Sequence, residues 1–269
     1  MDQIIKYYEG FNVKQIENIA VLTLDKPESA NTFGASFPTE FYRGLNDISE
    51  NGSIKVVVMK AEGRIFSAGG SMEIITTFET PYQWKMYINK LNKAVKTMYE
   101  MPQPIICAID GPSAGGGSNL ALSCDFVIAS ERAKFSDVFV NLGIVGDTGG
   151  LWNLCKLVGP MRAKEIAMRG LTINAEEALQ LGLVLKIVPS ERIDEEVMNL
   201  AREIAAKPMF ALRSIKSLVN KMPHMTHDTY CEIEEDLISV MLFTKDHKEG
   251  VRAFLEKRAP NFVGEDSQV

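Results

Sequence analysis

The residues that could most clearly take part in a chemical reaction form a glycine-rich turn, GPSAGGGSNL, over residues 111–120. The turn follows an apolar run, IICAID (105–110), and therefore stands at the end of a predicted strand. Because side chains are nearly absent here, the turn can offer backbone N–H groups. A second small-residue turn, RIFSAGGSM (64–72), follows the apolar run KVVVMKAEG (55–63). Together the two turns would present two N–H donors to one carbonyl oxygen, the arrangement known as an oxyanion hole.

Other interpretations of the glycine-rich turn can be tested on the sequence. A dinucleotide fingerprint fails for want of the third glycine of GxGxxG, and a P-loop fails for want of GKS or GKT. The letters GPSAG match GxSxG, the nucleophile elbow of α/β-hydrolases, which makes Ser113 a candidate nucleophile. A serine hydrolase needs a downstream histidine, and the three histidines all lie near the C-terminus: His224, His227 and His247. We expect Ser113 to be structural and keep the serine hydrolase as a weaker alternative.

The predicted secondary structure that must position these turns changes near residue 190, from alternating strands and helices to helices only. Before it, short β-branched runs alternate with helical stretches, which predicts a largely buried parallel sheet with crossover helices. The predicted strands are IAVLTLD, KVVVMKAEG, PIICAIDG, DFVIAS and LVLKIVP, and the clearest helices are FPTEFYRGLNDISEN and YQWKMYINKLNKAVKTMYEM. After it, four amphipathic stretches predict helices only. We therefore predict an α/β protein with a core region, 1–190, and a helical region, 191–269.

Composition excludes several classes of partner. The 269 residues are 46% hydrophobic, enough for one large globular domain, and the net charge of −6 without a basic stripe argues against nucleic acid. The N-terminus does not resemble a signal peptide and no run reaches the length of a membrane span. We expect a cytoplasmic protein with no membrane partner. The four cysteines are far apart in apolar runs, and the HxxH pair at His224 and His227 lacks a further ligand, so we predict reduced thiols and no metal site.

Six segments in order resemble the crotonase superfamily of acyl-CoA enzymes, which includes the enoyl-CoA hydratases and isomerases. They are LDKPESANTF (24–33), GRIFSAGGSM (63–72), IDGPSAGGGSNLALSCDFVIAS (109–130), KFSDVFVNLGIVGDTGGLWNLCKLVG (134–159), INAEEALQLGLVLKIV (173–188) and KEGVRAFLEKRAPNF (248–262). The resemblance implies a spiral of ββα repeats with a C-terminal helical region that assembles trimers or dimers of trimers. It implies that the N–H groups of Gly70 and Gly116 hold a thioester oxygen, and that coenzyme A enters only as part of the substrate, without a separate cofactor.

Departures from the hydratase pattern indicate which reaction follows. Hydratases of this family carry two glutamates, and this chain has Asn119 and Phe139 at those positions, which cannot exchange protons with a water molecule. Asp147, in GIVGDTGGLW, stands where isomerases of the family, including the phenylacetate-pathway ring-epoxide isomerases, place a single acid. We therefore expect an enoyl-CoA isomerase with Asp147 as its base. The alternatives are a hydratase or acyl-CoA hydrolase with a modified acid set, and a noncatalytic acyl-CoA binding protein. For the modified acid set Asp137 is the reserve acid, although we expect it in an exposed turn.

The remaining candidates surround this acid. Asp147 also has a structural alternative, the N-cap of a helix beginning in GGLWNLCKLV. We expect Phe139 and Trp152 to wall the pocket and to raise the pKa of Asp147 by excluding water. The resemblance also implies that Ala68 and Asn119 line the substrate pocket. It implies contacts with coenzyme A for Lys26, Ala30, Arg64 and Met72.

Overall fold

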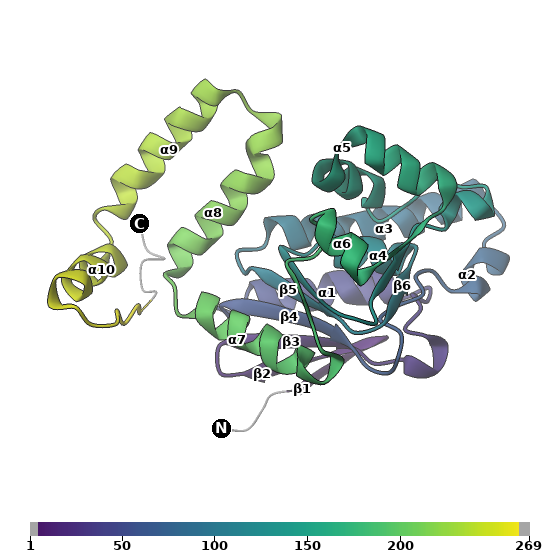
Figure 1. Ribbon diagram of the computed structural model, residues 1–269, viewed down its shortest axis with the longest axis horizontal. Coiled ribbons are helices and arrows are strands. Elements are labelled where there is room, and N and C mark those ends of the chain that lie inside the picture. Colours follow the sequence, from purple (N-terminus) through teal and green to yellow (C-terminus); the bar gives the residue numbers. More distant parts are fainter. Residues whose placement is uncertain (1–4, 264–269) are drawn as a thin grey trace.

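The computed structural model describes residues 5–263, in which two sheets carry the fold (Figure 1). The larger sheet has the strand order β1 (Ile5–Tyr8), β2 (Phe11–Ile16), β3 (Ile19–Leu24), β4 (Val56–Ala61), β5 (Ile105–Ile109), β7 (Phe126–Ser130) and β10 (Lys186–Val188). The first three strands pair antiparallel, and β3, β4, β5, β7 and β10 pair parallel. These five parallel strands are the five predicted from the β-branched runs. A smaller sheet holds β6 (Pro112–Ala114), β8 (Lys134–Ser136) and β9 (Thr172–Asn174).

Both faces of the parallel part of the larger sheet are buried, which explains why β3, β4, β5 and β7 read as continuous apolar runs. Successive residues point to opposite faces. In β4, Val57 and Met59 join the main core under α1 (Phe37–Ser49) and α3 (Pro81–Glu100). Val56 and Val58 instead face a second core that includes residues of α7 (Ile193–Ala205). The α/β architecture predicted from the alternation of runs is therefore confirmed.

The chain leaves the sheet after α7. This helix covers the second face of the sheet, so the helical region expected from residue 191 begins as part of the core. The three helices that follow, α8 (Met209–Lys221), α9 (His227–Met241) and α10 (Lys245–Glu256), form an arm. Figure 1 shows α9 and α10 beyond α8, away from both sheets. No helix in the described range is long and apolar enough to cross a membrane.

A buried lysine helps to dock α8 on the core, together with Asn220, whose Nδ2 donates to the carbonyl oxygen of Tyr99 at 3.2 Å. Lys216 is buried, and its ammonium group lies 2.8 Å from Oδ2 of Asp125 and donates to the carbonyl oxygen of Gln103 at 2.9 Å. Asp125 also accepts the backbone N–H of Ile105 in β5 at 2.7 Å. Because an unpaired charge is costly away from water, this arrangement fixes where the arm begins.

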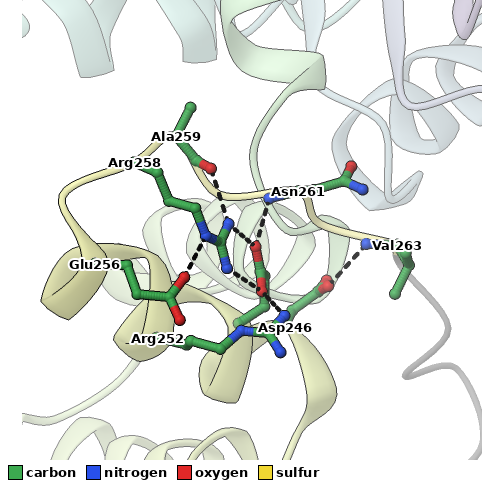
Figure 2. A network of polar contacts seen from close by, with 8 residues as sticks. Asp246, Arg252, Glu256, Arg258, Ala259, Asn261 and Val263 are labelled. Atoms are coloured by element: carbon green, nitrogen blue, oxygen red, sulfur yellow. Dashed lines mark hydrogen bonds and ion pairs between the residues drawn. The ribbon is translucent and has the colours of Figure 1, made fainter.

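A polar network that includes Arg252, Arg258 and Asn261 lies at the end of the arm (Figure 2), and most of its hydrogen bonds are accepted by Glu249 of α10. Its carboxylate accepts hydrogen bonds from the guanidinium of Arg258 and from the backbone N–H of Asn261 at 2.9 Å. The N–H of Val263 donates to Oδ1 of Asp246 at 3.0 Å. Residues 259–263 are therefore held against α10 rather than against the sheets.

Four more helices begin near the loops that carry the candidate residues: α2 (Met72–Thr77), α4 (Gly116–Ala121), α5 (Gly150–Arg169) and α6 (Ala175–Gln180). Short 3₁₀ turns occur at Pro27–Ser29, Phe139–Leu142, Ser190–Arg192 and Met222–His224. α2 begins at the last residue of the turn 64–72, and α4 begins within the turn 111–120.

Candidate active site

The two glycine-rich turns lie side by side, as the sequence predicted. The N–H of Ala114 donates to the carbonyl oxygen of Ser67 at 2.9 Å. A Cβ atom on Gly69, whose φ is +81°, would lie 2.9 Å from the backbone nitrogen of Gly116, and one on Gly117 would lie 2.4 Å from the oxygen of Ser67. Glycine is required here because any side chain would push the turns apart.

Each turn presents one N–H group that no acceptor in the described part of the chain occupies. Phe33 forms an isolated parallel bridge with Gly70. The N–H of Phe33 donates to the carbonyl oxygen of Gly69 at 2.7 Å, and the carbonyl oxygen of Phe33 accepts from the N–H of Ser71 at 3.1 Å. The N–H of Gly70 consequently points away from the bridge. Gly116 is the first residue of α4, where N–H groups have no partner within the helix. These two N–H groups are those that the sequence predicted for the oxyanion hole.

The carboxylate of Asp147 lies next to the second of these donors. A Cβ atom on Gly116 would be 3.5 Å from Oδ1 of Asp147 and 3.2 Å from Cε2 of Phe33. Burial raises the pKa of the Asp147 carboxyl above its ordinary value, and the hydrogen bond that Oδ1 accepts from Oγ1 of Thr148 at 2.8 Å acts in the opposite direction. A carboxylate with a raised pKa is a stronger base than one in water, which suits proton transfer.

A hollow of about 580 Å³ opens beside Asp147, between α3 and the loop 144–149. Much of its lining is apolar, which suits an aliphatic or aromatic group better than a charged one. The α3 residues that line it share one side of that helix: Trp84, Ile88, Asn92, Val95, Lys96 and Tyr99.

Asn119 and Phe139 lie around the loop that carries Asp147. Asn119 is buried in α4, and its Nδ2 donates to the backbone carbonyl oxygen of Asp147 at 2.9 Å. Phe139 is also buried, and its ring would lie 3.3 Å from a Cβ atom on Gly146. Both residues therefore lie close to the loop that carries Asp147, and the side-chain amide of Asn119 hydrogen-bonds the backbone of that loop.

Asp147 does not cap a helix. α5 begins at Gly150, its N-cap residue is Gly149, and no side chain accepts a hydrogen bond from its first turn. The capping alternative for Asp147 is therefore wrong. Its side chain is directed to Gly116 instead.

Trp152 does not line the hollow beside Asp147. Its ring stacks on His224 with a centroid separation of 6.0 Å and meets Tyr99 edge-on at 5.8 Å. Gly150 faces Asn119, and a residue two positions further along a helix points roughly 200° away. Trp152 thus packs on another side of α5, and burial of Asp147 comes from other residues.

The residues expected to bind coenzyme A lie on two segments that run together. Nδ2 of Asn31 donates to the carbonyl oxygens of Glu62 and Ile65, both at 2.9 Å, and the N–H of Ala68 donates to the oxygen of Ala30 at 3.0 Å. The residues expected to contact coenzyme A or the substrate lie on these two segments: Lys26, Ala30, Arg64, Ala68 and Met72. Their contact with coenzyme A stays a prediction.

Ser113 has no histidine beside it in the described structure. It is buried in β6, where its hydroxyl lies 3.0 Å from the hydroxyl of Ser118 and donates to the carbonyl oxygen of Lys134 at 2.9 Å. A serine nucleophile requires an adjacent base, so this arrangement does not support a serine hydrolase. Within residues 5–263, no group of three or more histidine, cysteine, aspartate or glutamate residues is placed to hold a metal ion.

Sequence reasoning missed two residues near Asp147 and misjudged the surroundings of a third. Tyr87 of α3 donates weakly to the carbonyl oxygen of Phe33 at 3.4 Å, and burial, with a smaller effect of the Asp147 carboxylate, raises its pKa. In the sequence, only the position of Tyr87 on the apolar side of α3 could have identified it. Thr148 could have been found as a β-branched residue in the turn-like run GDTGG. Asp137, expected in an exposed turn, is half-buried, and burial raises its pKa.

Known proteins resemble this chain in sequence and in fold. The model of the family described as Enoyl-CoA hydratase/isomerase matches residues 14–265. The chain is 33% identical to the 1,2-epoxyphenylacetyl-CoA isomerase of Escherichia coli (strain K12), over 92% of this chain and 96% of that protein. It is 32% identical to the crotonyl-CoA hydratase of Syntrophomonas wolfei, over 95% and 98%. The crystal structure of an enoyl-CoA hydratase from Polaromonas sp. JS666 superposes with a TM-score of 0.90 at 31% identity, over 94% of this chain and 99% of that one. The chain therefore has the crotonase fold and belongs to the enoyl-CoA hydratase/isomerase family.

Proposed function

We propose that this protein is an isomerase that moves a carbon–carbon double bond in an enoyl-CoA thioester, with Asp147 as its single acid–base residue. The observation that carries the proposal is the position of the Asp147 carboxylate beside Gly116, where Oδ1 lies 3.5 Å from the place a Cβ atom would take. A thioester oxygen bound by Gly70 and Gly116 would hold its C2 carbon near that carboxylate. Asn119 and Phe139 offer no second acid–base group at the two hydratase positions.

The reaction divides into two proton transfers. Ionised Asp147 takes a proton from C2 of a 3-enoyl thioester, and the electron pair of the broken C–H bond delocalises onto the thioester oxygen as a dienolate. The N–H groups of Gly70 and Gly116 stabilise that oxyanion, each contributing about 3 to 4 kcal/mol in systems where such a donor was removed. The protonated carboxyl then returns its proton to C4, which leaves the conjugated 2-enoyl thioester and restores the ionised base.

Hydration makes a different demand on the site. Adding water across the double bond requires groups that remove a proton from water and deliver one to C2. Neither hydratase position supplies such a group, because the side-chain amide of Asn119 is hydrogen-bonded to the backbone carbonyl oxygen of Asp147 and Phe139 is apolar. The relatives carry both isomerase and hydratase names, so the choice between the two reactions rests on these side chains.

The same proposal assigns the remaining parts of the molecule. Coenzyme A would lie along Lys26, Ala30, Arg64 and Met72, with its thioester entering past Ala68 toward Gly70. The acyl group would occupy the hollow between α3 and residues 144–149, whose apolar lining matches it. The arm formed by α8, α9 and α10 would join copies of the chain in a trimer or a pair of trimers.

Substitution of the base tests the proposal. Asp147→Asn keeps the shape of the side chain and removes the base, so conversion of 3-hexenoyl-CoA to 2-hexenoyl-CoA should fall at least ~100-fold while binding of the thioester changes little. Asp137→Asn is the matched control and should keep its activity. Reaction in D₂O should place deuterium at C2 or C4. The proposal is wrong if Asp147→Asn isomerises at the wild-type rate, or if the wild type hydrates crotonyl-CoA and isomerises nothing.

A further inference from the structure

The turn that carries Asp147 has an unsuitable residue at its centre. The N–H of Gly150 donates to the carbonyl oxygen of Asp147 at 2.9 Å, and the two residues between them have positive φ angles, +56° at Thr148 and +67° at Gly149. Turns with two positive φ angles strongly prefer glycine or asparagine at both central positions. A β-branched residue such as threonine is strained there. Gly149 follows the rule and Thr148 breaks it.

The strained residue, Thr148, makes a buried hydrogen bond to the side chain of Asp147. Thr148 is fully buried, with 0% of its surface exposed, and its hydroxyl donates to Oδ1 of Asp147 at 2.8 Å. A glycine at this position would relieve the strain and lose the bond. An asparagine, the other preferred residue, would place an amide where the hydroxyl now stands. Threonine is therefore explained by its hydroxyl and not by the backbone conformation.

Asn119 holds the same turn from the side of α4. Its Nδ2 donates to the carbonyl oxygen of Asp147, which also closes the turn by accepting from Gly150. The plane of the amide packs directly on Gly150, because a Cβ atom there would lie 1.9 Å from Cγ of Asn119. The strained conformation is thus fixed by two hydrogen bonds on one oxygen and by a close contact.

We propose that Thr148 is a positioning residue whose hydroxyl orients the Asp147 carboxylate and stabilises its ionised form, and that Asn119 holds the strained turn that makes this bond possible. The proposal rests on the function proposed for Asp147. Backbone strain retained beside a reacting group is typical of sites where the strained residue performs a task. Asn119 then has a role of its own, distinct from lining the pocket.

The direction of the effect on titration follows from the contacts. A hydrogen bond donated to a carboxylate favours the ionised form, so the Thr148 hydroxyl lowers the pKa of Asp147 against the opposing effect of burial. The ionisable groups around Asp147 are on α3: Tyr87, and Lys96 in the lining of the hollow. α4 contributes the neutral amide of Asn119. Loss of the Thr148 hydroxyl should therefore raise the pKa of Asp147.

A pair of variants separates the hydroxyl from the shape of the side chain. Thr148→Val keeps the volume and branching without the donor, and Thr148→Ser keeps the donor. Because the base acts when ionised, activity is lost as the pH falls through the pKa of Asp147. Thr148→Val should therefore move the acid limb of kcat/KM for 3-hexenoyl-CoA to higher pH and lower kcat about tenfold. Thr148→Ser should restore the wild-type profile.

A second pair tests the strain. Thr148→Gly removes the strained side chain, and Glu17→Gly does the same at a remote exposed turn where φ is +55°. Glu17→Gly should raise the melting temperature, because glycine adopts positive φ freely. Thr148→Gly should gain less, because it also deletes a fully buried side chain and its hydrogen bond. Only Thr148→Gly should lower the rate of isomerisation. If it is more stable and equally active with an unchanged pH profile, Thr148 is not a positioning residue.

Direct titration keeps this inference separate from the proposed function. The Asp147 carboxyl can be followed by ¹³C NMR with Asp147→Asn to assign its resonance, and its pKa should rise in Thr148→Val and recover in Thr148→Ser whatever the reaction is. An unchanged pKa in Thr148→Val overturns the inference. Failure of the proposed function would appear as a wild type that does not isomerise, with this shift in pKa still present.

Discussion

At the scale of single residues, the two proposed oxyanion donors differ in how much space surrounds them. A Cβ atom on Gly70 would meet nothing within 4 Å, whereas one on Gly116 would approach Phe33 and Asp147. A substitution at Gly116 therefore disturbs packing as well as chemistry. Gly70 is the position where the oxyanion hole can be tested without altering the fold.

Gly70→Val should place its side chain in the space where the thioester oxygen is expected. The melting temperature should stay within about a degree of the wild type, because no neighbouring atom has to move. Turnover should fall by roughly 100-fold, the lower end of what loss of one oxyanion-hole donor costs. Gly52→Val is the matched control, since a Cβ atom there also meets nothing within 4 Å and the residue lies in a remote turn. Equal activity of both variants would remove Gly70 from the site.

The sequence located the reacting residues better than their surroundings. Asp147 and the two glycines could be found because the motifs that carry them are local. The direction of Trp152 could not, because it depends on α5 beginning at Gly150 rather than at Asp147. The strain at Thr148 was also missed, since the run GDTGG indicates a turn without indicating which of its residues takes a positive φ angle.

At the scale of elements, the contact between α4 and α5 decides where the Asp147 loop lies. The amide of Asn119 occupies the space that a side chain on Gly150 would need. α5 can therefore begin where it does only with glycine at its first position. This contact joins the turn that provides Gly116 to the loop that provides the base.

Gly150→Ala should break this contact. Its methyl group would overlap the Asn119 amide, and overpacking of this kind costs about 1 to 3 kcal/mol, so thermal unfolding should occur at a lower temperature. The Asp147 loop should move as well and reduce activity. Adding Asn119→Ala to the same chain makes room for the methyl group and should recover much of the stability without recovering the activity. A Gly150→Ala protein that is as stable and as active as the wild type would show that the two helices are free to separate.

The sequence predicted the buried parallel strands, and it missed the antiparallel strands β1 and β2 and the strands of the smaller sheet. The five parallel strands are largely apolar on both faces, and α1 and α3 have clear apolar stripes, so these elements can be distinguished by their residue patterns alone. β6, β8 and β9 have three residues each, too few for a period to show. β6 is in fact part of the glycine-rich turn, which looked like a loop in the sequence.

At the scale of the whole molecule, the arm exposes large apolar side chains that its own chain does not cover. Phe243 of the α9–α10 connection is 80% exposed, and Phe254 and Leu255 of α10 are 83% and 73% exposed. A soluble chain rarely leaves such residues clustered in water. This exposure supports the proposal that the arm joins copies of the chain.

Light scattering at micromolar concentration tests the assembly. The wild type should have three or six times the 29.9 kDa mass of one chain. Phe254→Asp places a charge in the apolar surface of α10 and should shift the protein toward the monomer. Tyr7→Asp, at a residue of β1 that is 71% exposed, is the matched control and should leave the mass unchanged. A wild type that scatters as a monomer near 30 kDa would contradict the proposal.

The exposure of α9 has a consequence for when this helix exists at all. None of its fifteen residues is buried by the chain that makes it, and a helix of this length is marginal in water without packing. Its backbone amides should therefore exchange hydrogen for deuterium quickly in dilute solution and slowly in concentrated solution, because only a second molecule can protect them. Exchange in β4, which lies in the core of one chain, should not depend on concentration. Whether α9 is folded would then depend on the concentration of the protein, because one chain alone does not stabilise this helix.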